Sequence, residues 1–184
     1  MKQICGFCYT GYMKKLLAEI SDESLGFPDG AVKLGSDYRL RKSARVILLN
    51  DQGLMATQYL ENYSYHKLPG GGVNLGETVE AAAVREVLEE VGCKCELVSD
   101  VGMTIEYRNE HPLIHISYCF LAKVIGEIGK PALEAGEIEE GQVTKWVEPE
   151  ELLALMNTDE PQKYKGHFIL EREKSFLREY LNNK

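Results

Sequence analysis

The sequence predicts an α/β protein in which helices cover both sides of a mixed β-sheet. Runs rich in β-branched and aliphatic residues lie on both sides of an amphipathic central helix, and further helical patterns follow late in the chain. With 184 residues, of which 44% are hydrophobic, the chain has enough apolar residues for one substantial core but is too short for a second full domain.

The N-terminal part of the chain reads differently from the rest. Leu16, Leu17 and Ile20 recur at helical spacing and predict a short helix within residues 12–20, and the turn-rich residues 21–30 follow. We therefore expect residues 1–37 to form an N-terminal extension and residues 38–184 to form the main domain, including a C-terminal helix.

Strand patterns fill much of the main domain. Residues 38–50 and 54–60 flank a turn at Asp51-Gln52-Gly53 and predict a hairpin. Other strands are expected at residues 94–101, 103–108, 113–124 and 143–147. Residues 126–141 are acidic and glycine-rich, which is typical of a solvated loop, and Pro149 begins a late helix in its first turn.

The strongest strand, residues 113–124, has a clear alternation. Ile114, Ile116, Tyr118, Phe120 and Ala122 share one face, and His115, Ser117 and Cys119 share the other. His115 is a candidate catalytic base, but a single histidine within such an alternation is more often structural, and we favour the structural interpretation.

A glycine-rich loop, residues 70–72, leads into the central helix, which carries an unusual group of carboxylates. At roughly 100° per residue, Glu86, Glu89 and Glu90 fall within an arc of about 100°, opposite an apolar strip. That strip contains Val84, Val87, Leu88 and Val91 and is expected to face the core. Glu86 and Glu90 repel each other one turn apart, and only Arg85 is near enough in sequence to compensate. A hard divalent cation such as Mg²⁺, which prefers oxygen ligands, would neutralise them.

Read from Gly71, this stretch resembles the Nudix box, G-x5-E-x7-R-E-U-x-E-E-x-G-U, where U is a bulky aliphatic residue. The matching positions are Gly71, Glu77, Arg85, Glu86, Val87, Glu89, Glu90 and Gly92. Only Cys93 departs, at a position where an aliphatic residue is usual; free cysteine packs as a small hydrophobe, so packing is affected more than chemistry.

The resemblance implies a Nudix α/β/α sandwich and a hydrolase of nucleoside diphosphate derivatives or nucleoside triphosphates that depends on Mg²⁺ or Mn²⁺. It implies that Glu86 and Glu90 are direct metal ligands, and that Glu89 holds a second metal or acts as the base. Arg85 would orient Glu89 or Glu77 by a forked hydrogen bond. Glu77 would support the loop, and the Gly70 carbonyl would complete the coordination.

The general base is open between two places in the chain. In some branches of the family it lies on the box helix, and in others on a loop before the late strand, which here is residues 137–140. We favour Glu89 and keep Glu140 as the alternative.

Two other functions on the same fold are considered. A non-catalytic ligand sensor would tolerate a broken box, whereas here every catalytic position is filled. An isomerase of prenyl diphosphates would need a cysteine in its pocket, and only Cys119 is a candidate. The substrate is not defined by a clean signature; Tyr63, Tyr65, Tyr107 and Arg108 are candidates to stack on a base or hold a phosphate.

The composition and charge of the chain limit the classes of partner that it is expected to bind. The net charge of −8 and the pI near 5.1 argue against stable nucleic-acid binding and disfavour a decapping enzyme. No apolar run is long enough to cross a membrane and no secretory signal is visible, so a cytoplasmic protein is expected. The five cysteines are expected to be reduced, with Cys5 and Cys8 in a dispensable tail. A small nucleotide is the expected partner, and a homodimer is left open.

Overall fold

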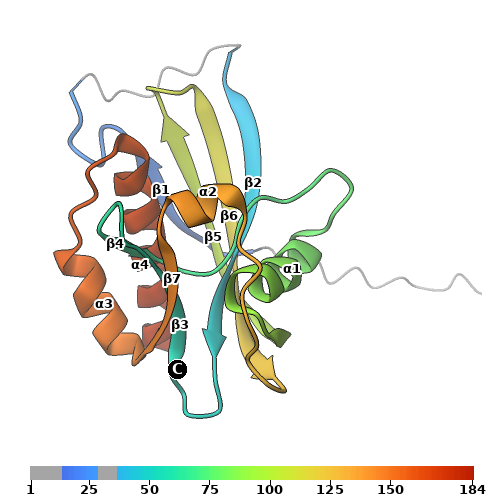
Figure 1. Cartoon of the computed structure of the whole chain (residues 1–184). Helices are drawn as coiled ribbons and strands as arrows, with labels where there is room; N and C mark the ends of the chain where they lie inside the picture. Colours follow the sequence, from blue (N-terminus) through green and yellow to red (C-terminus); the bar gives the residue numbers. More distant parts are fainter. Residues whose placement is uncertain (1–13, 29–36) are drawn as a thin grey trace, which may run out of the picture.

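The computed structural model describes residues 14–28 and 37–184 and gives them the order of elements shown in Figure 1. The strands are β1 Leu16–Ser21, β2 Arg39–Leu49, β3 Met55–Leu60, β4 Tyr65–Lys67, β5 Lys94–Arg108, β6 Leu113–Ile125 and β7 Gln142–Val147. The helices are α1 Val79–Val91, α2 Ala135–Glu139, α3 Pro149–Thr158 and α4 Tyr164–Asn183. Helix α1 lies on one side of the mixed sheet, and α3 and α4 lie on the other, which confirms the predicted α/β class.

The sheet divides into two parts between β2 and β3. Its strand order is β1-β5-β6-β2-β3-β4, with β7 also paired to β3. The predicted hairpin joins β2 to β3 at a single residue pair, Leu49 with Met55, after which β2 pairs in parallel with β6 while β3 pairs with β4 and β7. Residues 69–71 then take the place of β3 beside β2: the amide of Ala44 donates to the Gly71 carbonyl at 3.0 Å.

Strand alternation separates the protein into two cores. Ala44, Val46 and Leu48 of β2 belong to the core that contains the buried apolar residues of α1. Ile47, between them, belongs to the second core, which β2 shares with α3 and α4. Strand β6 follows the predicted alternation, because Phe120 packs in the first core and Cys119 in the second. Odd-numbered residues of β2 therefore face α4 and even-numbered ones face α1.

The N-terminal helix prediction is wrong in the part that the structure describes. Leu16–Ser21 is the strand β1, which pairs in parallel with β5, and its Ile20 is 2% exposed. An unpaired strand edge offers a full row of backbone hydrogen-bond partners, and this overrides the weak preference of a short segment for helix. Thus β1 belongs to the same sheet as the main domain, and the predicted boundary at residue 37 stays a prediction.

The expected orientation of the central helix is also wrong in part. Val84 and Leu88 are 39% and 51% exposed, whereas Glu86 and Glu90 are buried beside Val87. Helix α1 packs against the sheet through alanine and valine, and its buried side also includes two carboxylates. The helix therefore presents charge to the interior, where a compensating group is required.

Two smaller differences concern the strand and loop beyond α1. Residues 94–108 form one strand instead of two, with irregular pairing near Gly102, whose added Cβ would lie 2.7 Å from Leu17. The acidic segment of residues 126–141 contains the short helix α2.

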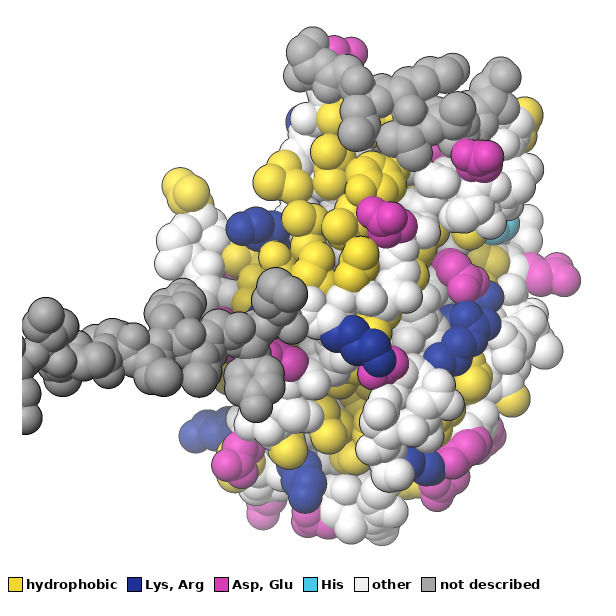
Figure 2. Space-filling view, turned by 180° about the vertical axis from the view of Figure 1, so that it is seen from behind, with side chains coloured by type: hydrophobic (Ala, Val, Ile, Leu, Met, Phe, Trp, Pro, Cys, Tyr) yellow, Lys and Arg dark blue, Asp and Glu magenta, His cyan; other side chains and the backbone are white. Residues whose placement is uncertain are grey.

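The rear surface carries dispersed charge. Hydrophobic side chains gather in the upper part of this face, while basic and acidic side chains alternate over its lower part (Figure 2). Among the described helices, none is long and apolar enough to cross a membrane.

Candidate active site

Helix α1 is bounded by local signals that fix its position. The Thr78 hydroxyl accepts a hydrogen bond from the Ala81 amide at 3.2 Å, and Gly92 ends the helix in the left-handed conformation at φ 77°. Glu86 and Glu90 are four residues apart within this helix, so they project from the same side. The two carboxylates thus meet the glycine-rich loop together.

Glu90 is the most deeply placed carboxylate of α1, with 1% exposure. One carboxylate oxygen accepts a hydrogen bond from the Gly70 amide at 2.6 Å. The other lies 3.2 Å from the Lys67 ammonium nitrogen and 3.1 Å from the Gln142 side-chain nitrogen. Lys67 is a compensating cation that sequence spacing did not reveal, because it lies on β4, 23 residues before Glu90.

The glycines before the helix leave no room for side chains. A Cβ added to Gly71 would lie 2.4 Å from a carboxylate oxygen of Glu86, and one added to Gly70 would lie 2.2 Å from the Ala44 carbonyl oxygen. Gly70 also has φ of 134°, which other residues rarely adopt. The loop can therefore approach both β2 and the carboxylates. The predicted role of the Gly70 carbonyl stays a prediction; the amide is the group seen to contact Glu90.

Arg85 connects the remaining residues of the box. Its guanidinium forks onto both oxygens of Glu77, at 2.9 and 3.1 Å, and one terminal nitrogen lies 2.8 Å from both Glu86 and Glu89. Its other terminal nitrogen donates to the Gly72 carbonyl at 2.8 Å. Glu77 in turn accepts from the Asn74 amide at 2.9 Å. Arg85 thus contacts both partners considered for it and fixes the loop against the helix.

The loop carboxylate that reaches the helix is Glu137, and Glu140 lies elsewhere. Glu86, Glu90 and Glu137 each offer a carboxylate oxygen, and these oxygens lie within 4.8 Å of one another. Glu140 instead pairs with Lys165 of α4 at 2.8 Å. The sequence could not separate the two because both lie in one acidic segment; α2 turns Glu137 toward α1.

The three clustered carboxyls are hard to ionise together. Burial raises the pKa of Glu137 to about 7, and the nearby charge of Glu90 adds to this shift. Burial also raises the pKa of Glu86, again with a contribution from Glu90, although Arg85 opposes it. In contrast, the hydrogen bonds from Arg85 lower the pKa of Glu77. An all-oxygen donor set of this kind suits a hard divalent cation, so these three residues fit a metal site.

A second polar network lies between the sheet and α4. Glu106 is fully buried and contacts Arg108 and Arg172, the latter at 2.8 Å. Burial lowers the pKa of His115 to about 4, although Glu106 opposes the shift, so the imidazole is neutral at pH 7. Its Nε2 lies 3.0 Å from the Ser43 hydroxyl. His115 therefore lies in this network, as expected for a structural histidine.

Other candidates from the sequence divide between this network and the surface. Arg108 and Tyr65 line the same cavity as His115. The hydroxyl of Tyr107 instead donates to Glu19, and that of Tyr63 accepts from Lys163. Cys119 is packed in the second core, and burial raises its thiol pKa well above the usual value. Cys5 and Cys8 lie outside the described residues.

Comparison with known proteins identifies the family in which this arrangement occurs. The family model for the NUDIX domain matches residues 39–167, which include the clustered carboxylates and the glycine-rich loop described above. The chain belongs to the NUDIX family. The expected class, a Nudix hydrolase that cleaves a diphosphate linkage, is confirmed with it. Cys119 is 1% exposed within the second core, which disfavours the isomerase alternative because that function requires a cysteine in the pocket.

Curated relatives of this Nudix protein include RNA pyrophosphohydrolases. The protein of that name from Erythrobacter litoralis is 32% identical over 137 residues, covering 65% of this chain and 83% of its own length. One from Wolbachia pipientis is 33% identical over 87 residues, covering 46% of this chain and 54% of its own. The match thus spans about half the length of the Wolbachia relative.

Solved structures share the fold at lower identity. The NUDIX hydrolase from Nitrosomonas europaea matches with a TM-score of 0.59 at 16% identity, covering 79% of this chain and 91% of its own. The MutT protein from Methanosarcina mazei matches with a TM-score of 0.55 at 20% identity, covering 82% and 100%. The Nudix sandwich predicted from the box is therefore the fold of this chain.

Proposed function

We propose that this Nudix protein is a pyrophosphohydrolase of a small nucleotide that requires Mg²⁺ or Mn²⁺. The observation that carries the proposal is the meeting of Glu86, Glu90 and Glu137, whose oxygens lie within 4.8 Å of one another. Their mutual repulsion and the raised pKa values of Glu86 and Glu137 call for a cation, and a diphosphate brought to the same place needs one as well. A bound divalent ion neutralises charge on the phosphate oxygens and makes bound water more acidic.

Each residue of the site has a proposed task. Glu86, Glu90 and Glu137 hold the cation. Glu89 takes a proton from the attacking water. Arg85 holds one carboxylate oxygen of Glu89 at 2.8 Å, and the Glu89 side chain is 37% exposed, so solvent water can reach it. Arg85 positions Glu89.

The surrounding groups keep this arrangement in place. Glu77 fixes the loop through Arg85 and Asn74. Lys67 and the Gly70 amide hold Glu90 in one orientation. The pairing of Glu140 with Lys165 disfavours Glu140 as the base.

The test is hydrolysis of a nucleotide panel by the purified protein, with Mg²⁺, Mn²⁺ or EDTA, measured as phosphate released after phosphatase coupling. We expect turnover only with a divalent ion and a loss of about 10²- to 10³-fold in kcat for Glu90→Gln, the usual scale for a key electrostatic group. Glu80→Gln, on the exposed side of the same helix, is the matched control. Near-normal turnover by a folded Glu90→Gln protein would refute the proposed metal site.

A second candidate substrate is the 5′ end of an RNA. It is favoured by the 32% identity to the Erythrobacter RNA pyrophosphohydrolase. It is disfavoured by the net charge of −8. Competition between a nucleoside triphosphate and a 5′-triphosphate oligoribonucleotide distinguishes the two candidate substrates. If the protein contacts RNA beyond the triphosphate, the oligonucleotide should be the better substrate and its binding should depend strongly on salt.

A further inference from the structure

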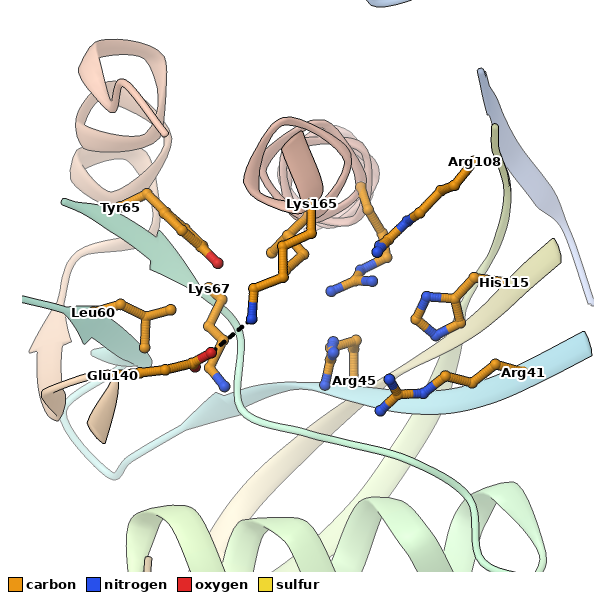
Figure 3. A pocket seen from close by; sticks show the side chains of 11 residues that line it. Arg41, Arg45, Leu60, Tyr65, Lys67, Arg108, His115, Glu140 and Lys165 are labelled. Atoms are coloured by element: carbon orange, nitrogen blue, oxygen red, sulfur yellow. Dashed lines mark hydrogen bonds and ion pairs between the residues drawn. The ribbon is translucent and has the colours of Figure 1, made fainter. Parts of the chain in front are cut away.

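A cavity of about 160 Å³ lies between the sheet and α4, and its lining is unusually basic for an acidic protein. Figure 3 shows basic side chains from β2, β4, β5 and α4 with their nitrogen atoms directed into one space. The cationic residues that line it are Arg41, Arg45, Lys67, Arg108, Lys165 and Arg172. We call this cavity the basic pocket.

Nearby carboxylates do not balance these charges. Among the described residues, the six cations of the basic pocket form ion pairs with four carboxylates: Glu90, Glu106, Glu140 and Glu173. His115 does not add to the charge because it is neutral at pH 7. Arg41 forms no ion pair with any residue in the described part of the chain. Two positive charges are left over in a chain whose net charge is −8.

Two polar groups of the lining also have unused hydrogen-bonding capacity. The hydroxyl of Tyr65 has no hydrogen-bond partner among the described residues, and the Nε of Arg45 forms no hydrogen bond with them although it lies 3.3 Å from a Glu173 carboxylate oxygen in an ion pair. These side chains belong to residues that are only 6% and 1% exposed. A buried donor without a hydrogen-bond partner destabilises the folded protein, so such groups are normally kept for a ligand or water. Both are donors that suit an anionic oxygen.

The size and chemistry of the basic pocket favour a phosphate over a nucleobase. Pockets for drug-sized molecules usually measure about 300 to 1,000 Å³ and are mostly apolar. This one is smaller, and apart from the Tyr65 ring its apolar lining is limited to Leu60 and Ile169. Guanidinium groups bind phosphate oxygens in a geometry that few other groups match.

Lys67 joins the basic pocket to the carboxylates of α1. Its ammonium nitrogen lies 3.2 Å from Glu90, and the same side chain lines the basic pocket. We propose that the basic pocket binds a phosphate group that the substrate carries beyond the bond that is cleaved. The preferred substrates are then 5′-triphosphates and longer polyphosphates, on a free nucleotide or an RNA end, and not diphosphates joined to an uncharged sugar. This inference rests on the proposed function.

Kinetics on a pair of substrates with the same nucleoside tests the inference. We expect the wild-type protein to have a higher kcat/KM for ATP than for ADP-ribose, which lacks the third phosphate. Arg41→Gln and Lys165→Gln should each lower kcat/KM for ATP by about tenfold or more, the scale of one charge-assisted contact, and change ADP-ribose by less than about twofold. The control is Lys123→Gln. Lys123 is exposed and lies eight residues along β6 from His115, roughly 26 Å away, so this variant should leave kcat/KM unchanged for both ATP and ADP-ribose. A 5′-triphosphate oligoribonucleotide, assayed in parallel, identifies the source of the triphosphate.

A binding measurement keeps this inference separate from the proposed function. Titration calorimetry with inorganic tripolyphosphate in EDTA needs no hydrolysis, and we expect binding that the Arg41→Gln/Lys165→Gln double variant loses. If no nucleotide is hydrolysed but this binding is observed, the proposed function fails and the basic pocket stands. Absence of binding to the wild type, or equal effects of Arg41→Gln on ATP and ADP-ribose, would overturn the inference.

Discussion

The affinity of the site for Mg²⁺ should fall steeply as the pH falls through neutrality, and Glu137 should cause most of this. Its pKa is raised to about 7, so it retains a proton that the cation must displace. With a pKa of about 7, roughly nine-tenths of the carboxyl is ionised at about pH 8 and roughly one-tenth at about pH 6. The dissociation constant should therefore rise about tenfold between these two values, and Glu86, whose pKa is also raised, adds to the change.

The raised pKa of Glu137 also makes the stability of the folded protein depend on pH. A carboxyl whose pKa is higher in the folded than in the unfolded protein lowers the free energy of unfolding as the pH rises from about 4.5 through 7. The metal-free protein should lose stability over that interval, and saturating Mg²⁺ should restore it. Thermal unfolding with and without Mg²⁺, at several pH values, checks this.

The assay for affinity is titration calorimetry with Mg²⁺, or electron paramagnetic resonance with Mn²⁺, across the same pH range. Glu137→Gln should bind the cation more weakly at about pH 8 and lose most of the pH dependence, because glutamine has no proton to release. Glu140→Gln is the matched control from the same acidic segment. It should keep both the affinity for the cation and its pH dependence, since Glu140 pairs with Lys165. A full pH dependence in Glu137→Gln would refute this reasoning.

Three further substitutions test the site. Gly71→Ala should reduce kcat by at least about tenfold in a folded protein, because the new Cβ would lie 2.4 Å from the Glu86 carboxylate; unchanged kinetics would contradict the close approach of the loop. Arg85→Lys cannot form the fork onto Glu77, and we expect kcat to fall about 10- to 100-fold with little change in far-ultraviolet circular dichroism. His115→Gln should leave the pH dependence of kcat unchanged, since the pKa of about 4 keeps this residue neutral; loss of an inflection near pH 6.5 would identify it as a base instead.

The part of the site that the sequence predicts is the part built by local geometry. Glu77, Arg85, Glu86, Glu89 and Glu90 lie within 14 residues, and helical spacing alone brings most of them together. The structure gathers all of them around the glycine loop. Periodicity also predicted the faces of β6, because one strand determines its own alternation.

The parts that were missed depend on contacts between distant segments. Lys67 reaches Glu90 only because residues after β4 replace β3 beside β2. Glu137 reaches α1 only because α2 forms in a segment that reads as a loop. Strand β1 forms because the edge of β5 is available to it. No periodicity within these segments specifies such meetings.

The divided sheet explains how an acidic chain can bind an anionic substrate. Strand β2 lies between α1 and α4, and its alternation sends Arg45 toward the basic pocket while Ala44, next to it, packs in the core with α1. Carboxylates that attract a cation and arginines that attract phosphate are thereby kept on opposite faces of one strand. The basic pocket and the clustered carboxylates adjoin where β3 leaves β2, because Lys67, which lines the basic pocket, and the Gly70 amide both contact Glu90. A polyphosphate that follows the positive potential is therefore led to the place where the clustered carboxylates can hold its metal.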